Sequence, residues 1–313
     1  MYRIAFFEVI HMRTLRGPKS LLYSQKLAPY VFVMPFIIVF LLFFIYPAIS
    51  TIIMSFQKVE PGNVQFIGLE NFRRLNNSEF YLAAANNGIY TVLTLAVLIP
   101  GPMLLAIFLN SKIMAARNFF RSVFFIPALT SIVVAGFVFR LIFGELPGSL
   151  LNEIIGMFGY EPIKWLGGPS RATTFFSLVM LACWRWTGVN ILYFLSGLQN
   201  IPEELYESAS IDGANAFQKM WLITVPMLKP TTIYVLTISI FGGLAMFVES
   251  FMLFGGNRSP GGSGLTIIGY LYRFGWEQAN LGFGSAIGLT LLVAALTINV
   301  IQLRLFGLYR RES

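Results

Sequence analysis

The chain has 313 residues, of which 56% are hydrophobic and only 12% are charged, and its mean hydropathy is +0.71. Soluble domains carry roughly 25% charged residues, so this composition excludes a soluble protein and indicates an integral membrane protein. The net charge of +8 requires no nucleic acid as a partner, because basic residues at the cytoplasmic ends of membrane helices account for it. The only histidine, His11, and the only cysteine, Cys183, exclude a histidine-based metal cluster and a disulfide framework.

The N-terminal segment, residues 1–27, is expected to be a basic cytoplasmic tail. Its apolar run from Ala5 to Ile10 is too short for a signal peptide. Arg13, Arg16 and Lys19 follow this run, where a cleaved signal peptide would have small residues.

Six segments are apolar enough to cross a bilayer, for which a helix needs about 20 residues. The predicted crossings are residues 29–56, 86–110, 119–143, 173–198, 231–254 and 283–305. Pro35 and Pro47 predict kinks in the first, and the second is interrupted by Pro100-Gly101-Pro102. The connections at 57–85 and 144–172 and the Gly-rich stretch from Gly255 to Gly264 are expected to be loops, and a polar stretch then runs to Gly282. Lys and Arg are more frequent on the side that holds both termini, which predicts that the termini are cytoplasmic.

The longest polar interval of the second half, residues 203–230, reads EELYESASIDGANAFQKMWLITVPMLKP. Pro202 can open a helix, with Glu203 and Glu204 in its first turn and Leu205 and Ala209 on one face. Gly after Asp212 predicts a break, because glycine readily adopts the left-handed conformation.

The second half of this interval predicts another short helix, capped by Asn215 and stopped by Pro226 and Pro230. Its apolar stripe is expected to consist of Phe217, Met220, Trp221 and Thr224. A helix–Gly–helix protrusion with such a stripe suits docking into a partner's groove. An ordinary connection between helices is the plain alternative.

The residues of this interval resemble the "EAA" loop of ABC importer permeases. The departures are Ser208, where Ala is usual, and Val225, where Leu is usual. The resemblance assigns coupling to an ATPase to Glu207, Ser208, Ala209, Asp212, Gly213, Ala214, Ile223 and Pro226. It covers about residues 28–306 and is strongest for the sugar-importer branch, whose pattern this chain matches at Leu198-Gln199-Asn200-Ile201-Pro202, Gly148…Asn152, Trp165-Leu166, Trp184…Gly188 and Gly255-Gly256.

The resemblance implies an all-α permease bundle of six transmembrane helices with a cytoplasmic coupling helix, a permease domain at 28–306 and a cytoplasmic tail at 307–313. Its implied partners are a second homologous permease, two ATPase subunits, an extracellular solute-binding protein, a sugar and the bilayer of a bacterial plasma membrane. The chain has no GxxxxGK[ST] pattern, so ATP and Mg²⁺ are expected on the ATPase subunits and no cofactor on this chain. Stretches such as FFIPALTSIVVAGFVFRLIFGE look most like permeases of arabinose-oligosaccharide importers.

Charged and aromatic residues inside the apolar segments are the candidates for a substrate pathway, because intramembrane charge is costly. They are Trp184, Arg185, Trp186, Tyr193, Phe247 and Glu249, with Tyr234 as a weaker candidate. Tryptophans beside an arginine can stack on a sugar and bind its hydroxyls. An Arg185–Glu249 ion pair that holds the bundle is the structural alternative, and Arg140 can extend to the membrane interface.

Two other functions remain open from the sequence. One is an ABC importer permease for another solute, such as a phosphorylated polyol. The other, from a different class, is an ion-coupled secondary transporter, which typically shows inverted repeats with paired broken helices. No such repeat is evident here, and that function leaves the 203–230 interval unexplained. A receptor or a structural membrane protein fits the pattern least well.

Overall fold

The computed structural model describes residues 26–60, 62–111, 114, 116–145, 148–168, 170–257 and 259–306. The tail predicted at 307–313, and residues 1–25 of the N-terminal tail, lie outside the described residues. The chain divides after Met54 into two compact units, and each is described by itself.

The first predicted crossing is one continuous helix of 28 residues, Ala28–Ser55. It consists of α3 (Ala28–Phe40), the π-helical turn η1 (Leu41–Ile45) and α4 (Tyr46–Ser55). The prolines expected to kink it do not divide it. The π turn ends two residues before Pro47, and its wider backbone gives the proline ring room beside the preceding turn.

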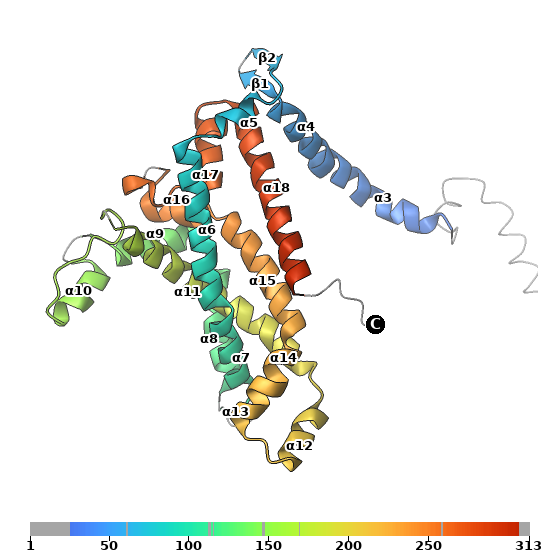
Figure 1. Ribbon diagram of the computed structural model, residues 1–313, viewed down its shortest axis with the longest axis vertical. Coiled ribbons are helices and arrows are strands. Elements are labelled where there is room, and N and C mark those ends of the chain that lie inside the picture. The colour runs from blue at the N-terminus through green and yellow to red at the C-terminus, as the bar shows by residue number, and fades with distance from the viewer. Residues whose placement is uncertain are drawn as a thin grey trace, which may run out of the picture. The chain divides into compact units, whose positions relative to one another are not determined.

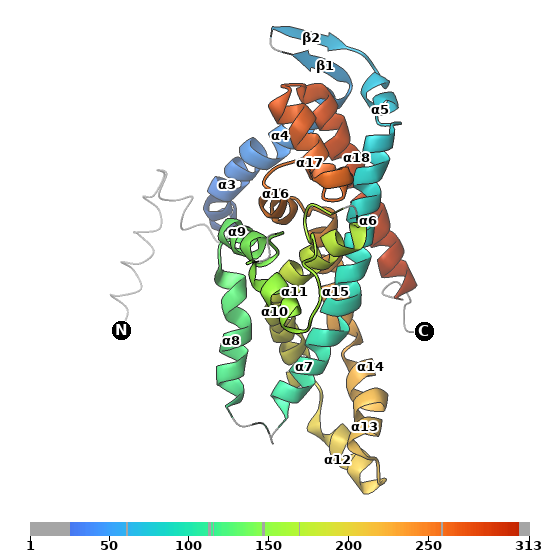
Figure 2. The ribbon, with the colours of Figure 1, turned by 90° about the vertical axis from the view of Figure 1, so that its left-hand side faces the viewer.

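The regular structure described in the second unit consists of helices, helical turns and one antiparallel hairpin, β1 (Gln57–Glu60) and β2 (Asn63–Phe66). The longer helices are α6 (Ser78–Leu98), α7 (Pro100–Asn110), α8 (Arg117–Leu129), α9 (Ile132–Ile142), α11 (Arg171–Gln199), α15 (Lys229–Leu244) and α18 (Leu281–Leu305). The shorter helices and helical turns are α5 (Glu70–Arg74), α10 (Leu150–Met157), α12 (Glu203–Ile211), α13 (Ala216–Lys219), η2 (Met220–Thr224), α14 (Val225–Met227), α16 (Val248–Phe254), η3 (Pro260–Gly262), α17 (Ile267–Leu271) and η4 (Tyr272–Glu277). Figures 1 and 2 show α6 and α7 running from the hairpin at one end of this unit to α12 and α13 at the other.

The second crossing begins eight residues earlier than predicted, so the expected loop at 57–85 contains the hairpin, α5 and two turns of α6. The Asn77 side chain caps α6 by accepting a 2.9 Å hydrogen bond from the Phe80 N–H. The interruption at Pro100-Gly101-Pro102 does not end the crossing, because α6 and α7 form one span of 33 residues. Pro102 has no N–H to donate to the Leu98 carbonyl. The side-chain amide of Asn190 on α11 donates to this carbonyl instead, at 2.9 Å.

The third predicted crossing is not one straight helix. α8 and α9 meet at a 97° bend, where Thr130 and Ser131 are extended. The fifth crossing ends at Leu244 rather than at Phe254, and α16 is a separate short helix. The hydropathy of the sequence did not predict the break between α8 and α9 or the one between α15 and α16, because the apolar run continues through both.

The buried Asn87 side chain stabilises the end of the fifth crossing. Its amide donates to the carbonyls of Gly243 and Leu244 at 3.0 and 3.1 Å, which belong to the last turn of α15. Its oxygen accepts from the Ile267 N–H at 2.8 Å, at the start of α17. The polar stretch predicted after Gly264 contains α17 and η4, and the positive φ angles of Gly255 and Gly256 confirm a turn at the start of the Gly-rich loop.

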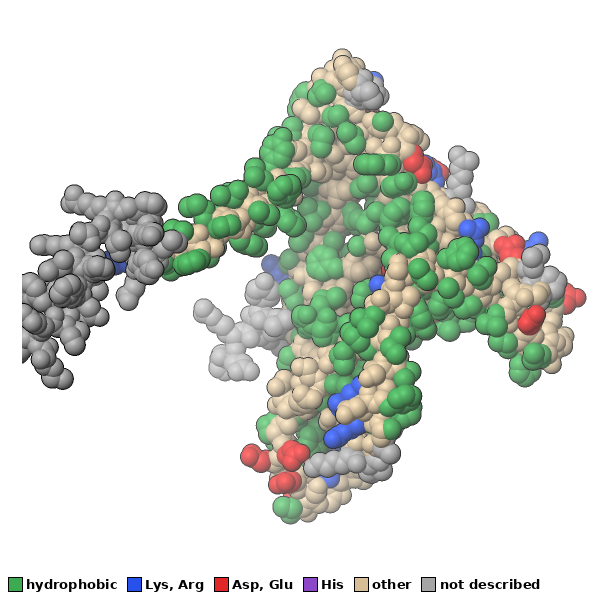
Figure 3. All heavy atoms as spheres, turned by 180° about the vertical axis from the view of Figure 1, so that it is seen from behind, with side chains coloured by type: hydrophobic (Ala, Val, Ile, Leu, Met, Phe, Trp, Pro, Cys, Tyr) green, Lys and Arg blue, Asp and Glu red, His purple; other side chains and the backbone are tan. Residues whose placement is uncertain are grey.

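Helix α11 is the centre of the second unit and packs against α6, α7, α8 and α15. Gly188 allows α11 to approach α8 closely, because a Cβ at this position would overlap the Phe124 carbonyl oxygen on α8. Four helices of the described chain are long and apolar enough to cross a membrane, and the two bent pairs raise the number to six. Figure 3 shows hydrophobic side chains over most of the second unit, and acidic side chains both at its α12 end and where α10 lies.

Candidate functional site

The first candidate site is the α12–α14 segment, which begins as predicted. Pro202 precedes α12, and Glu203 and Glu204 occupy its first turn. The helix ends at Ile211 with Asp212 as its C-cap, and the next residue, Gly213, has a φ of +78°, in the left-handed region that glycine tolerates. The Ala214 N–H returns to the Ala209 carbonyl at 2.9 Å, which closes the break and confirms its predicted position.

The second short helix also begins where the sequence predicts. Asn215 and Gln218 form a capping box, in which each side chain accepts from the other residue's backbone N–H at 2.9 and 2.8 Å. The predicted stop at Pro226 is wrong, because the helix continues to Met227, and Pro230 lies in the first turn of α15. The π turn η2 ends two residues before Pro226, as η1 does before Pro47, and a 62° bend then leads into α15.

A side-chain hydrogen bond that the sequence did not predict joins the two arms of this segment, which are α12 and the helix that runs from α13 through η2 to α14. The Tyr206 hydroxyl on α12 lies 2.8 Å from the Thr224 hydroxyl in η2. Thr224 is therefore buried between the arms and is not part of the exposed stripe where it was expected. Phe217 and Trp221 form that stripe, with exposures of 66% and 48% and ring centroids 6.1 Å apart.

The coupling residues implied by the resemblance differ in exposure. Glu207, Ser208, Asp212, Gly213 and Pro226 are exposed, and Ala209, Ala214 and Ile223 are half-buried. One end of the second unit therefore carries an exposed pair of aromatic rings, Phe217 and Trp221, and a group of carboxylates that includes Glu207 and Asp212. This arrangement presents a surface for a protein partner. Their roles in coupling stay a prediction.

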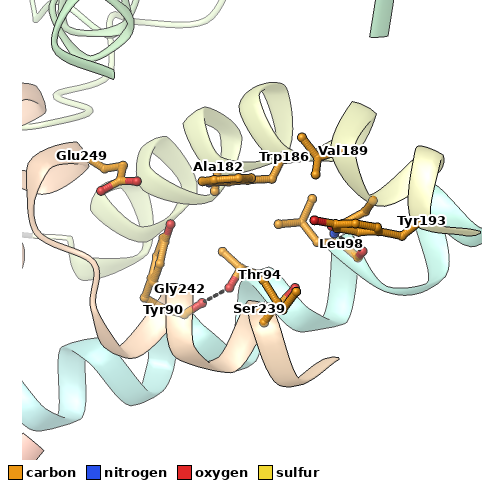
Figure 4. A pocket seen from close by; sticks show the side chains of 13 residues that line it. Tyr90, Thr94, Leu98, Ala182, Trp186, Val189, Tyr193, Ser239, Gly242 and Glu249 are labelled. Atoms are coloured by element: carbon orange, nitrogen blue, oxygen red, sulfur yellow. Dashed lines mark hydrogen bonds between the residues drawn. The ribbon is translucent and has the colours of Figure 1, made fainter. Parts of the chain in front are cut away.

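The second candidate site is a cavity of about 110 Å³ between four helices of the second unit (Figure 4). α6, α11, α15 and α16 line it with Tyr90, Thr94, Leu98, Ala182, Trp186, Val189, Asn190, Tyr193, Ile238, Ser239, Gly242, Gly243 and Glu249. Glu249 lies at one end of the cavity and Tyr193 at the other. Aromatic faces with hydroxyl, amide and carboxyl groups suit a hydroxylated ligand that is apolar on its ring faces.

Three of the six predicted substrate residues reach this cavity, namely Trp186, Tyr193 and Glu249. Trp184 packs instead on Phe139, with ring centroids 5.4 Å apart. Phe247 packs on Phe251 and Tyr272 at 5.2 and 5.4 Å. Tyr234 contacts the Tyr193 ring at 5.2 Å but does not line the cavity.

Arg185 does not face the cavity, although its neighbour Trp186 does. Its guanidinium donates a short hydrogen bond to the Thr130 carbonyl and lies over the Trp186 ring, 5.5 Å from the centroid. Among the described residues no ion pair joins it to Glu249, so the expected Arg185–Glu249 pair is not formed. Arg185 therefore holds the backbone at the 97° bend between α8 and α9.

The sequence did not identify Tyr90, Thr94, Asn190 and Ser239 as lining residues. A usable signal was present, because Tyr90, Thr94 and Leu98 recur every four residues on one face of α6. Trp186, Asn190 and Tyr193 follow one another at spacings of four and three residues, which also places them on one face of α11. Nothing in either helix shows that these two faces meet. Within the described part of the chain, no group of three His, Cys, Asp or Glu side chains could hold a metal ion.

Comparison with known proteins identifies the family. The family model described as "Binding-protein-dependent transport system inner membrane component" matches residues 20–310. The chain is 54% identical over 297 residues to the "Arabinooligosaccharides transport system permease protein AraP" of Bacillus subtilis (strain 168). That alignment covers 95% of this chain and 94% of the relative.

Two solved structures share the fold. A chain of a bacterial ABC transporter involved in the import of the acidic polysaccharide alginate aligns with a TM-score of 0.79 at 24% identity, over 91% of this chain and 96% of that chain. A chain of a bacterial alginate ABC transporter in complex with an alginate pentasaccharide-bound periplasmic protein aligns with a TM-score of 0.76 at 25% identity, over 88% and 92% of the two chains. These findings confirm the predicted multi-pass permease bundle. The chain belongs to the family of binding-protein-dependent transport system inner membrane components.

Proposed function

We propose that this permease carries arabinose-containing or closely similar oligosaccharides across the membrane in an ATP-driven importer. One observation carries the proposal, namely the 54% identity, over nearly the whole of both chains, to a permease named for arabinooligosaccharides. The four-helix cavity supports it. The faces of Trp186 and Tyr193 can pack on the apolar faces of sugar rings, while Thr94, Ser239 and Glu249 offer partners for sugar hydroxyls.

The working importer contains partners that this chain does not supply. We infer a second homologous permease subunit, two ATPase subunits that bind ATP and Mg²⁺, and an external solute-binding protein. The chain itself binds no cofactor and hydrolyses no ATP. The structural neighbour described with its periplasmic protein supports the solute-binding partner. ATP-driven closure of the ATPases moves the docked α12–α14 segment, and the bundle then alternates between inward- and outward-facing states.

Uptake by the reconstituted complex tests the substrate. Proteoliposomes that hold the two permeases, the ATPases and the binding protein are expected to accumulate labelled arabinotriose only when ATP is present. Maltotriose of the same length is the matched competitor and is expected to compete poorly. Equal competition by maltotriose, or no accumulation of arabinotriose, would contradict the proposed substrate.

The termini and the α12–α14 segment are proposed to be cytoplasmic, which the bias of basic residues supports. Single cysteines at the exposed positions Glu70, Lys164 and Glu204 test this orientation in a chain with Cys183→Ala. An impermeant thiol reagent added to whole cells is expected to label the first two, and to label position 204 only after the cells are permeabilised. Labelling of position 204 in intact cells would overturn the orientation.

A further inference from the structure

The cavity between α6, α11, α15 and α16 contains one charged group among the described residues that line it. That group is the carboxyl of Glu249, and the other polar lining residues are neutral hydroxyl and amide side chains. None of the Lys and Arg residues in the described part of the chain lines the cavity to balance it. A sugar that enters the cavity therefore meets a negative charge at the end where Glu249 lies (Figure 4).

Glu249 is half-buried in the first turn of α16 and forms no ion pair with any Lys or Arg in the described part of the chain. The two arginines predicted inside the apolar segments are engaged elsewhere. Arg185 donates to the Thr130 carbonyl, and the Arg140 guanidinium lies against Gly255, in the turn after α16. Neither arginine therefore neutralises the Glu249 carboxyl in an ion pair.

We propose that Glu249 makes the cavity selective for uncharged oligosaccharides by repelling anionic sugars such as uronates. The inference rests on the proposed function, since it requires sugars to pass through this cavity. Sugar hydroxyls can donate to the carboxylate in charge-assisted hydrogen bonds, whereas a sugar carboxylate brings a like charge within a few ångströms. The fold itself does not set this preference, because the structural neighbour is described as importing the acidic polysaccharide alginate. A repulsive group in the pocket is the element that can exclude the charged competitor.

Binding of two matched probes to the purified importer in detergent, without the solute-binding protein, tests the inference. The probes are arabinotriose and a trisaccharide of the same length in which one residue is a uronic acid. Wild type is expected to bind the acidic probe about 100-fold more weakly than arabinotriose, as a like charge at this range predicts. Glu249→Gln keeps the size of the side chain and removes its charge. It is expected to weaken arabinotriose binding a few-fold and to strengthen binding of the acidic probe ten- to a hundredfold.

The matched control is Glu153→Gln, which removes an exposed carboxylate on α10, outside the cavity. This variant is expected to keep the wild-type preference. A merely structural role of Glu249 would lower the affinity for both probes together and would overturn the inference. Equal binding of the two probes by the wild-type importer would also overturn the inference, and this outcome does not depend on how any variant behaves. Failure of wild type to bind arabinotriose at all would overturn the proposed function, and this inference with it.

Discussion

Gly213→Val is expected to reduce ATP-dependent uptake by ten- to a hundredfold while the chain still inserts into the membrane. Gly213 has a φ of +78°, and no atom lies within 4 Å of a Cβ built at this position. The valine therefore meets no neighbour, and its cost is the backbone conformation alone, about 1–3 kcal/mol for a β-branched residue. Relaxing that strain turns α12 relative to α13 and displaces the surface proposed to dock on the ATPase. Each 1.4 kcal/mol corresponds to about a tenfold change in docking.

Gly213→Asn is the matched control, because asparagine adopts the left-handed region far more readily than valine. It is expected to retain most of the uptake. The measurements are the amount of ATPase that co-purifies with each variant and the substrate-stimulated ATP hydrolysis of the reconstituted complex. Normal values of both for Gly213→Val would show that the turn at this position does not transmit the movement.

Trp186→Ala is the second substitution with a large expected effect, a loss of arabinotriose affinity of roughly 60-fold. The Trp186 ring lines the cavity and offers the largest aromatic face there. Removing a contact of about 100 Å² of apolar surface costs about 2.5 kcal/mol at 25 cal/mol per Å². Direct binding of the labelled sugar to the purified complex measures this change.

Trp184 provides the control in the same helix turn, since its exposure of 39% is close to the 40% of Trp186. Its ring packs on Phe139 and does not line the cavity. Trp184→Ala is expected to lower the thermal stability of the complex and to leave sugar affinity per folded molecule unchanged. Equal losses of affinity in the two variants would contradict the assignment of the cavity as the sugar site.

Features set by neighbouring residues could be predicted from the sequence. The cap of α13 depends on Asn215 and Gln218, three residues apart, and the break at Gly213 depends on one residue's lack of a Cβ. The membrane class follows from composition, because about 20 consecutive apolar residues have few stable alternatives to a transmembrane helix. Pro226 shows where such local reasoning fails. The preceding π turn accommodates its ring, and no pattern of neighbouring residues indicates that turn.

Distant contacts decided where the apolar segments break. The bend after α8 is held by Arg185, 55 residues from its partner Thr130, and the end of α15 by Asn87, 156 residues from Gly243. A buried carbonyl freed from a helix needs a donor, and the tertiary structure alone determines which side chain reaches it.

The cavity also depends on contacts between residues far apart in the sequence. Trp186, Tyr193 and Glu249 could be suspected from residue type within apolar segments, but Tyr90 and Ser239 become lining residues only because α6 and α15 pack beside α11. The sequence by itself therefore determined a multi-pass membrane protein with a capped polar segment between two apolar ones, since composition and caps act within a few residues. The four-helix cavity was decided by helix packing, since its walls come from helices far apart in the chain.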